Sequence, residues 1–83
     1  MIDLGKYMYA KVIDQKPKSV VIGVYSQSSN VLLGKVKWYG PWRQYCFYPE
    51  PDTIFNTECL GEIATLLKTA QRFSVEIKKR KGS

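Results

Sequence analysis

The amino-acid sequence predicts a single α+β domain, in which an antiparallel β-meander of three to four strands packs on one amphipathic α-helix. Two observations carry this prediction. Up to residue 48 the chain consists of short stretches rich in β-branched and aromatic residues, separated by short turns. After Asn56, apolar residues recur at three- and four-residue spacing, which is the period of a helix. Eighty-three residues leave room for one hydrophobic core only.

The strands are expected after a loose lead-in at residues 1–5. Stretches with strand character occupy residues 6–13, 19–25, 31–39 and 42–48. Polar or Pro-containing turns separate them at residues 14–18, 27–30 and 40–41. Because strands joined by short turns pair with their sequence neighbours, the predicted sheet is an antiparallel meander.

One helix is predicted after the sheet. Asn56 can cap it, and Glu58 in its first turn suits the positive end of the helix dipole. Its apolar stripe consists of Cys59, Leu60, Ile63, Leu66, Leu67 and Ala70. The sheet offers the large apolar surface that this stripe needs. We therefore expect its burial to be the main stabilising event of the fold, at roughly 1.5–3 kcal/mol for each large side chain.

A C-terminal edge strand and a basic tail are expected to follow. Residues 73–77 alternate between apolar and polar, which is typical of a short half-buried strand. The domain would then comprise residues 1–77, and residues 78–83 would form a flexible tail. The tail contains Lys78, Lys79, Arg80 and Lys81. These cations could contact phosphates, or they could only keep the chain soluble.

The most informative stretch runs from Gly34 to Pro49, with six aromatic residues, three basic residues and no acidic one. If its two strands are joined by an even loop, Trp38 lies opposite Arg43, Val36 opposite Tyr45 and Gly34 opposite Phe47. One face is then mainly apolar, and the other combines cations with aromatic rings. The second face carries Lys35, Lys37, Tyr39, Trp42, Gln44, Cys46 and Tyr48. An odd loop would spread the charge over both faces, so the even register is preferred.

The net charge of +6 is unevenly distributed along the chain. Residues 1–49 hold seven Lys or Arg against two Asp, whereas residues 50–77 hold two against five acidic residues. The sheet half is therefore basic, the helix half is acidic, and residues 78–81 add four more positive charges. Such polarity favours partners of negative charge for the sheet half.

The residue types present argue against catalysis and against a metal or cofactor. The chain has no histidine, which is the commonest general base and the commonest zinc ligand. It has no Gly-rich phosphate loop, and Glu58 and Glu62, one helical turn apart, are expected to be surface charges. Cys46 and Cys59 have no metal-ligand spacing. Two buried thiols in a reducing compartment are the preferred interpretation, with a disulfide as the alternative.

No stretch approaches the eighteen apolar residues of a membrane span, and the N-terminus does not resemble a signal peptide. We therefore expect a cytoplasmic protein that does not contact a membrane.

One motif of the chain is formed by Trp38, Tyr39, Trp42, Arg43, Gln44, Tyr45, Phe47 and Pro49. Leu60 and Ile63 follow it in the predicted helix. With this motif, the chain resembles a group of small uncharacterised proteins of bacteriophages and other bacterial mobile elements, over roughly residues 31–67. The resemblance implies a phage or mobile-element origin and a place in the cytoplasm of a bacterial host. It implies no catalytic residue, cofactor or substrate.

Two functions fit the cationic and aromatic face. The first is binding of DNA or RNA, because Lys and Arg contact phosphates while aromatic rings stack on unpaired bases. The residues expected to bind are Lys35, Lys37, Tyr39, Trp42, Arg43, Gln44 and Tyr48. The alternative is a protein-interaction module that uses the same face, either as a homodimer or as an inhibitor of a host enzyme or defence complex. Tyr, Trp and Arg are the residue types enriched at interface hot spots.

Overall fold

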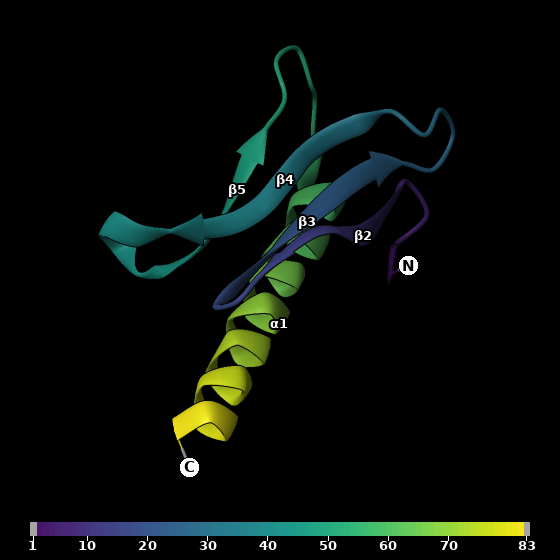
Figure 1. The fold of residues 1–83 in the computed structure, drawn as a ribbon. Coiled ribbons are helices and arrows are strands. Elements are labelled where there is room, and N and C mark those ends of the chain that lie inside the picture. The colour runs from purple at the N-terminus through teal and green to yellow at the C-terminus, as the bar shows by residue number, and fades with distance from the viewer. Residues whose placement is uncertain (1, 83) are drawn as a thin grey trace.

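The computed structural model describes residues 2–82, with side-chain surroundings for residues 2–72. Five strands precede one long helix (Figure 1). The elements are β1 (Ile2–Leu4), β2 (Met8–Lys16), β3 (Ser19–Ser26), β4 (Leu32–Tyr39), the 3₁₀ turn η1 (Gly40–Trp42), β5 (Gln44–Pro49) and α1 (Thr57–Gly82). All neighbouring strands pair antiparallel in the order β1-β2-β3-β4-β5, so the sheet is the expected meander.

The prediction of three to four strands was wrong, because the sheet has five. The additional strand is β1, in the segment expected to be a loose lead-in. Ile2 pairs with Ala10 and Leu4 with Met8, and Leu4 is buried in the core. Three residues are too few to show an alternating pattern in the sequence, so only the pairing with β2 reveals this strand.

The prediction of an edge strand at residues 73–77 was also wrong, because α1 continues from Thr57 to Gly82. An alternation over five residues cannot distinguish a strand from the last turns of a helix. Once a helix is nucleated, each further residue adds a hydrogen bond at little cost, which favours continuation. The backbone of residues 78–82 belongs to the same helix. The side chains of the four basic residues there lie outside the residues whose side chains the structure describes. The predicted domain boundary at residue 77 stays a prediction.

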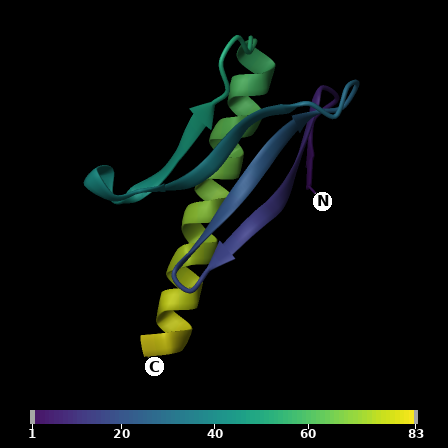
Figure 2. The same cartoon turned by 45° about the horizontal axis from the view of Figure 1, so that its top comes forward.

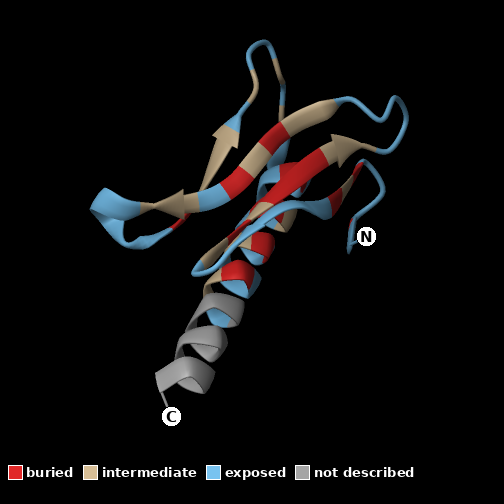
Figure 3. Cartoon of the chain, in the orientation of Figure 1, coloured by how far each residue is buried: buried red, intermediate tan, exposed pale blue. Residues whose placement is uncertain are grey.

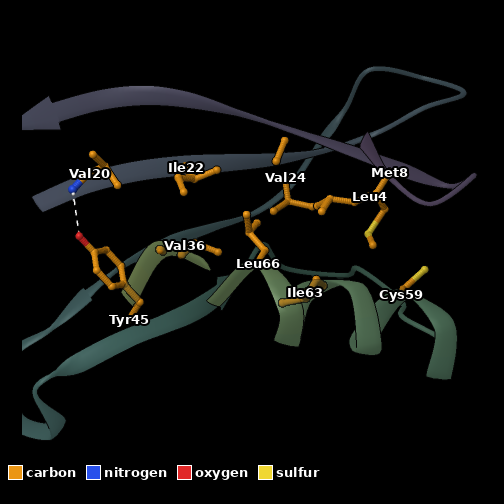
Figure 4. Close-up of a cluster of buried hydrophobic side chains, with 12 residues drawn as sticks. Leu4, Met8, Val20, Ile22, Val24, Val36, Tyr45, Cys59, Ile63 and Leu66 are labelled. Carbon is orange, nitrogen blue, oxygen red and sulfur yellow. Dashed lines mark hydrogen bonds between the residues drawn. The ribbon is translucent and has the colours of Figure 1, made fainter. Parts of the chain in front are cut away.

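The hydrophobic core lies between one face of the sheet and α1, which crosses the sheet on that side only (Figures 1 and 2). Buried residues cluster where helix and sheet face each other (Figures 3 and 4). The helix contributes Cys59, Ile63, Leu66 and Ala70 to this core. Leu67 packs against it, whereas Leu60 is 53% exposed and does not belong to the buried stripe.

The start of α1 confirms the predicted cap. The backbone N–H of Cys59 donates to Oδ1 of Asn56 at 2.8 Å, and the N–H of Leu60 donates to the Asn56 carbonyl at 2.9 Å. A donor that would otherwise lack a partner in the first turn is thereby satisfied.

The pairing of β4 with β5 corrects the predicted register but keeps the strand faces. Trp38 lies opposite Tyr45 instead of Arg43, since the ladder ends at Tyr39 opposite Gln44. Arg43 adopts the left-handed conformation (φ 52°), and its N–H donates to the carbonyl of Gly40 at 3.0 Å, which closes the turn. The shift is two residues. Because side chains alternate with a period of two, no strand residue changes face.

A hydrogen bond to a side chain links β3 to β5 beyond the point where β3 and β4 stop pairing. The pairs between these strands end at Ile22 opposite Val36. Beyond this point the N–H of Val20 donates to the hydroxyl of Tyr45 at 3.2 Å, in a buried position (Figure 4). The ring of Trp38 meets the ring of Tyr45 edge-on, with centroids 5.5 Å apart. Tyr45 of β5 therefore connects the far end of β3 to the β4–β5 hairpin.

Candidate functional site

The sheet face opposite α1 is uncovered, and its residues define the open face of the molecule (Figures 1 and 2). Since Val36 and Tyr45 point into the core, their strand neighbours point the other way. The open face consists of Tyr9, Lys11, Tyr25, Lys35, Lys37, Tyr39, Gln44, Cys46 and Tyr48, from strands β2 to β5. Five of the residues predicted to bind lie on it: Lys35, Lys37, Tyr39, Gln44 and Tyr48.

On β4 and β5 the predicted residues contact one another. The ammonium of Lys37 lies 4.4 Å from the centroid of the Tyr48 ring, a cation–π contact. The Tyr39 ring meets Tyr48 edge-on at 6.5 Å. Lys35 is paired directly with Tyr48, and Tyr39 with Gln44. The hairpin therefore places positive charge immediately beside aromatic rings.

The remaining two predicted residues lie in the turn instead of on the sheet. Trp42 ends η1 and is 67% exposed, but its ring still meets Tyr39 edge-on at 5.1 Å. Arg43 follows it and is exposed. Trp42 thus extends the open face at the tip of the hairpin through its contact with Tyr39. The even register predicted Trp42 as a strand residue, which was wrong because η1 removes residues 40–43 from the ladder.

The structure adds a second half to the face, which sequence reasoning missed. The rings of Tyr9 and Tyr25 stack with centroids 5.3 Å apart and an interplanar angle of 13°. The ammonium of Lys11 lies 5.1 Å from the centroid of Tyr25. The alternation of Tyr9 and Lys11 with the buried Met8 and Ala10 was the signal that could have found this half.

The two halves meet in one row across four strands. Lys11 pairs with Gly23, Gly23 with Lys35, and Lys35 with Tyr48. Gly23 leaves space on the open face, since a Cβ there would lie 2.7 Å from Cε1 of Tyr25. The Tyr25 ring therefore lies over Gly23, between the two lysines of the row. The cations and rings form one surface, not two separate patches.

The open face carries negative as well as positive charges at its margins. Asp3 on β1 and Asp14 near the β2–β3 turn point to the same side as Tyr9 and Val21, with which they pair.

The pKa of the Tyr48 phenol is raised from its ordinary value of 10.0, first by desolvation and then by the neighbouring Cys46 and Tyr39. At neutral pH Tyr48 is therefore an uncharged hydroxyl that does not repel an anion.

The two thiols are free, with Cys46 half-buried on the open face and Cys59 buried in the core. Within the described part of the chain, no group of three or more His, Cys, Asp or Glu could hold a metal ion. The same residues include no helix with the length and apolarity that a membrane crossing requires.

A groove of about 720 Å³ runs along the outer edge of the hairpin, between β5 and α1. Trp42 and Arg43 line one end, and Ala64, Leu67 and Lys68 line the helical wall. The backbone N–H of Tyr45 on this edge donates to Oε1 of Gln71 at 3.2 Å. Gln44 and Cys46 also line this groove, so it borders the open face along the edge of β5.

Comparison with known proteins supports the expected origin. The chain is 29% identical over 59 residues to an uncharacterized 9.3 kDa protein of Acholeplasma phage L2, a match that covers 71% of this chain and 76% of the phage protein. No family model matches the chain, and no solved structure matches it. The chain is thus similar to a small phage protein, whereas the motif at residues 38–49 stays a prediction.

Proposed function

We propose that the chain is a small non-enzymatic binding protein of a phage or mobile element, and that its open face binds nucleic acid in the cytoplasm of a bacterial host. The observation that carries this proposal is the repeated placement of a lysine ammonium beside a tyrosine ring, at 4.4 Å for Lys37 and Tyr48 and 5.1 Å for Lys11 and Tyr25. Phosphates and bases alternate along a nucleic acid, so a binding surface needs both kinds of group side by side.

Each predicted residue then has a chemical task. Lys35, Lys37 and Arg43 neutralise phosphates, which releases counterions and makes the affinity dependent on salt. Tyr39 and Trp42 stack on bases at the exposed end of the hairpin. Gln44 and the neutral hydroxyl of Tyr48 donate hydrogen bonds to phosphate or base oxygens. The cations at residues 78–81 add further phosphate contacts from the last turns of α1.

Titration of the Trp38 and Trp42 fluorescence with short oligonucleotides tests this function. We expect quenching at low salt that weakens steeply as salt is raised. The double variant Lys35→Glu/Lys37→Glu should abolish binding, because it removes two phosphate contacts and introduces two repulsive charges.

The matched control is Lys68→Glu/Arg72→Glu, which changes the net charge by the same amount at two exposed positions of α1. This control should bind nearly as well as the wild type. Equal loss in both double variants would show that only net charge matters, and no quenching by any oligonucleotide at low salt would refute the proposed function.

A protein-interaction module is the second candidate, and the exposure of Trp42 favours it. A tryptophan that is 67% exposed beside the β5–α1 groove is typical of an interface anchor. A homodimer or a complex with a host enzyme would bury it. Sedimentation of the purified chain measures self-association, and Trp42→Ala should abolish it. A protein contact centred on Trp42 should survive Lys35→Glu/Lys37→Glu, unlike nucleic-acid binding.

A further inference from the structure

We infer that the open face binds single-stranded nucleic acid, and that Tyr9, Lys11 and Tyr25 form the second half of this binding site. The inference rests on the proposed function and specifies the form of nucleic acid that the face recognises. It assigns roles to three residues of β2 and β3 that lie outside the β4–β5 hairpin.

The width of the face argues against a duplex as its ligand. The rings and cations lie on four adjacent strands, from Lys11 on β2 to Tyr48 on β5. Three interstrand spacings amount to roughly 14 Å between the outer backbones alone. The major groove of B-DNA is about 12 Å wide and admits a helix or a two-stranded ribbon. The four-stranded face therefore cannot enter it as a unit.

The chemistry of the face gives the same answer. A duplex presents phosphates outward and keeps its bases stacked on one another, so no base face is available for contact with the tyrosine rings of the sheet. In a single strand the bases are unpaired, and each can stack on an aromatic ring. The paired rings of Tyr9 and Tyr25 on one half, and the Tyr39–Trp42–Tyr48 cluster on the other, supply two such platforms.

The cations between the platforms can hold the backbone of the strand. Lys11 and Lys35 flank Gly23 from both sides, about 10 Å apart as two interstrand spacings. A strand that crosses the sheet from β2 to β5 passes Lys11, Lys35 and Lys37 while its bases reach both platforms. These contacts involve phosphates and base faces, which DNA and RNA share, so single strands of either sugar should bind.

The rival arrangement is a two-stranded ribbon in the major groove. The β4–β5 ladder continues to Tyr39 opposite Gln44, whereas the β3–β4 pairs end at Val36. The hairpin end could therefore enter a groove without the rest of the sheet. In that case Tyr25 and Lys11 would not touch the ligand, so substitutions on β2 and β3 decide between the two arrangements.

The test compares a twelve-nucleotide oligothymidylate with a twelve-base-pair duplex in the same fluorescence titration, at several salt concentrations. We expect the single strand to bind more tightly than the duplex. Tyr25→Leu should weaken single-strand binding roughly five-fold or more, while Tyr25→Phe, which keeps the ring, should bind as the wild type does. Lys11→Ala should reduce the slope of log affinity against log salt by about 0.7, and Lys68→Ala should leave it unchanged.

The outcomes separate this inference from the proposed function. Duplex binding that equals or exceeds single-strand binding, with no effect of Tyr25→Leu, would overturn the inference and leave nucleic-acid binding by the hairpin in place. Failure of both ligands to bind at low salt would overturn the proposed function itself. A clear preference between oligodeoxyuridylate and oligouridylate, which differ only in the sugar, would contradict the claim that single strands of either sugar bind. Circular dichroism of both Tyr25 variants distinguishes lost contacts from lost folding.

Discussion

Gly34 lies on β4 directly beneath the ring of Phe47, on the face that α1 covers. A Cβ at this position would come within 2.8 Å of Cε1 of Phe47 and of the Tyr48 carbonyl oxygen. The backbone oxygen cannot move away as the end of a flexible side chain could. The absence of a side chain at Gly34 therefore lets β4 and β5 pair while the Phe47 ring stays packed on the core and edge-on to Phe55, 5.4 Å away.

We predict that Gly34→Ala destabilises the fold by about 1–3 kcal/mol, because the added methyl group overpacks this contact. Urea unfolding followed by circular dichroism measures the change. Gly61→Ala is the control, since a Cβ there meets nothing within 4 Å. In the helix interior it should stabilise the protein by roughly 0.5–1 kcal/mol. Equal effects of the two substitutions would contradict the crowding argument.

Tyr45 is important for its hydroxyl as well as for its ring. The group accepts the N–H of Val20 in a buried position, at the point where β4 no longer pairs with β3. Tyr45→Phe would leave that N–H without a partner, and we predict a loss of about 1–3 kcal/mol in unfolding free energy.

Thermal and urea unfolding measure this loss, with Tyr9→Phe as the comparison. The hydroxyl of Tyr9 donates to Asn30 at an exposed position, where water can replace it. Its removal should change the unfolding free energy by no more than about 0.5 kcal/mol. A Tyr45→Phe variant as stable as Tyr9→Phe would show that water reaches Val20.

At the scale of elements, the start of α1 is determined by a local contact. The Asn56 side chain accepts the Cys59 N–H, so the helix begins directly after the Pro-containing connection from β5. We predict that Asn56→Ala costs about 1 kcal/mol and that Asn56→Asp or Asn56→Ser retains most of the stability, because both can accept the same hydrogen bond. Urea unfolding measures all three variants. A loss of stability in Asn56→Ser equal to that in Asn56→Ala would argue against the cap.

The β4–β5 hairpin shows how an element can keep its faces while its register changes. A turn of four residues replaced the shorter one that was expected, yet Lys35, Lys37, Tyr39 and Tyr48 remain on one face. The alternation of side chains depends only on whether the shift is even. The candidate residues on this hairpin could therefore be predicted from sequence, although their partners could not.

For the whole molecule, stability depends on one interface between the sheet and α1. Leu66 is 3% exposed and packs among the buried residues of β3 and β4 (Figure 4). Leu60, on the same helix, is 53% exposed. We predict that Leu66→Ala destabilises the fold by about 2–5 kcal/mol, because it removes buried apolar contacts and leaves a cavity.

Leu60→Ala is the matched control, since it makes the same chemical change in the same helix. It should alter the unfolding free energy by no more than about 0.5 kcal/mol. Chemical unfolding of both variants provides the comparison. Similar losses in the two variants would mean that α1 does not cover the sheet as described.

The sequence by itself determined the layered character of this protein, the faces of the strand residues in the β4–β5 hairpin and the start of the helix. These features follow from local patterns: side-chain alternation in residues 34–48, three- and four-residue spacing from Cys59 onward, and an Asn where the helix begins. Each of these features can be recognised from a short segment, without knowing which other segments contact it. Leu60 is the exception in the stripe, because it follows Cys59 directly and so lies about 100° around the helix from it, at the margin of the buried side.

Only the tertiary structure decided which segments pair and how far the elements extend. β1 is a strand because β2 lies beside it, and α1 continues through residues 73–77 although their alternation favours a strand. The row from Lys11 through Gly23 to Lys35 exists because three strands align in one register. Such pairings join residues that are distant in sequence, and local patterns do not encode them. The open face as a four-stranded surface is therefore a property of the fold.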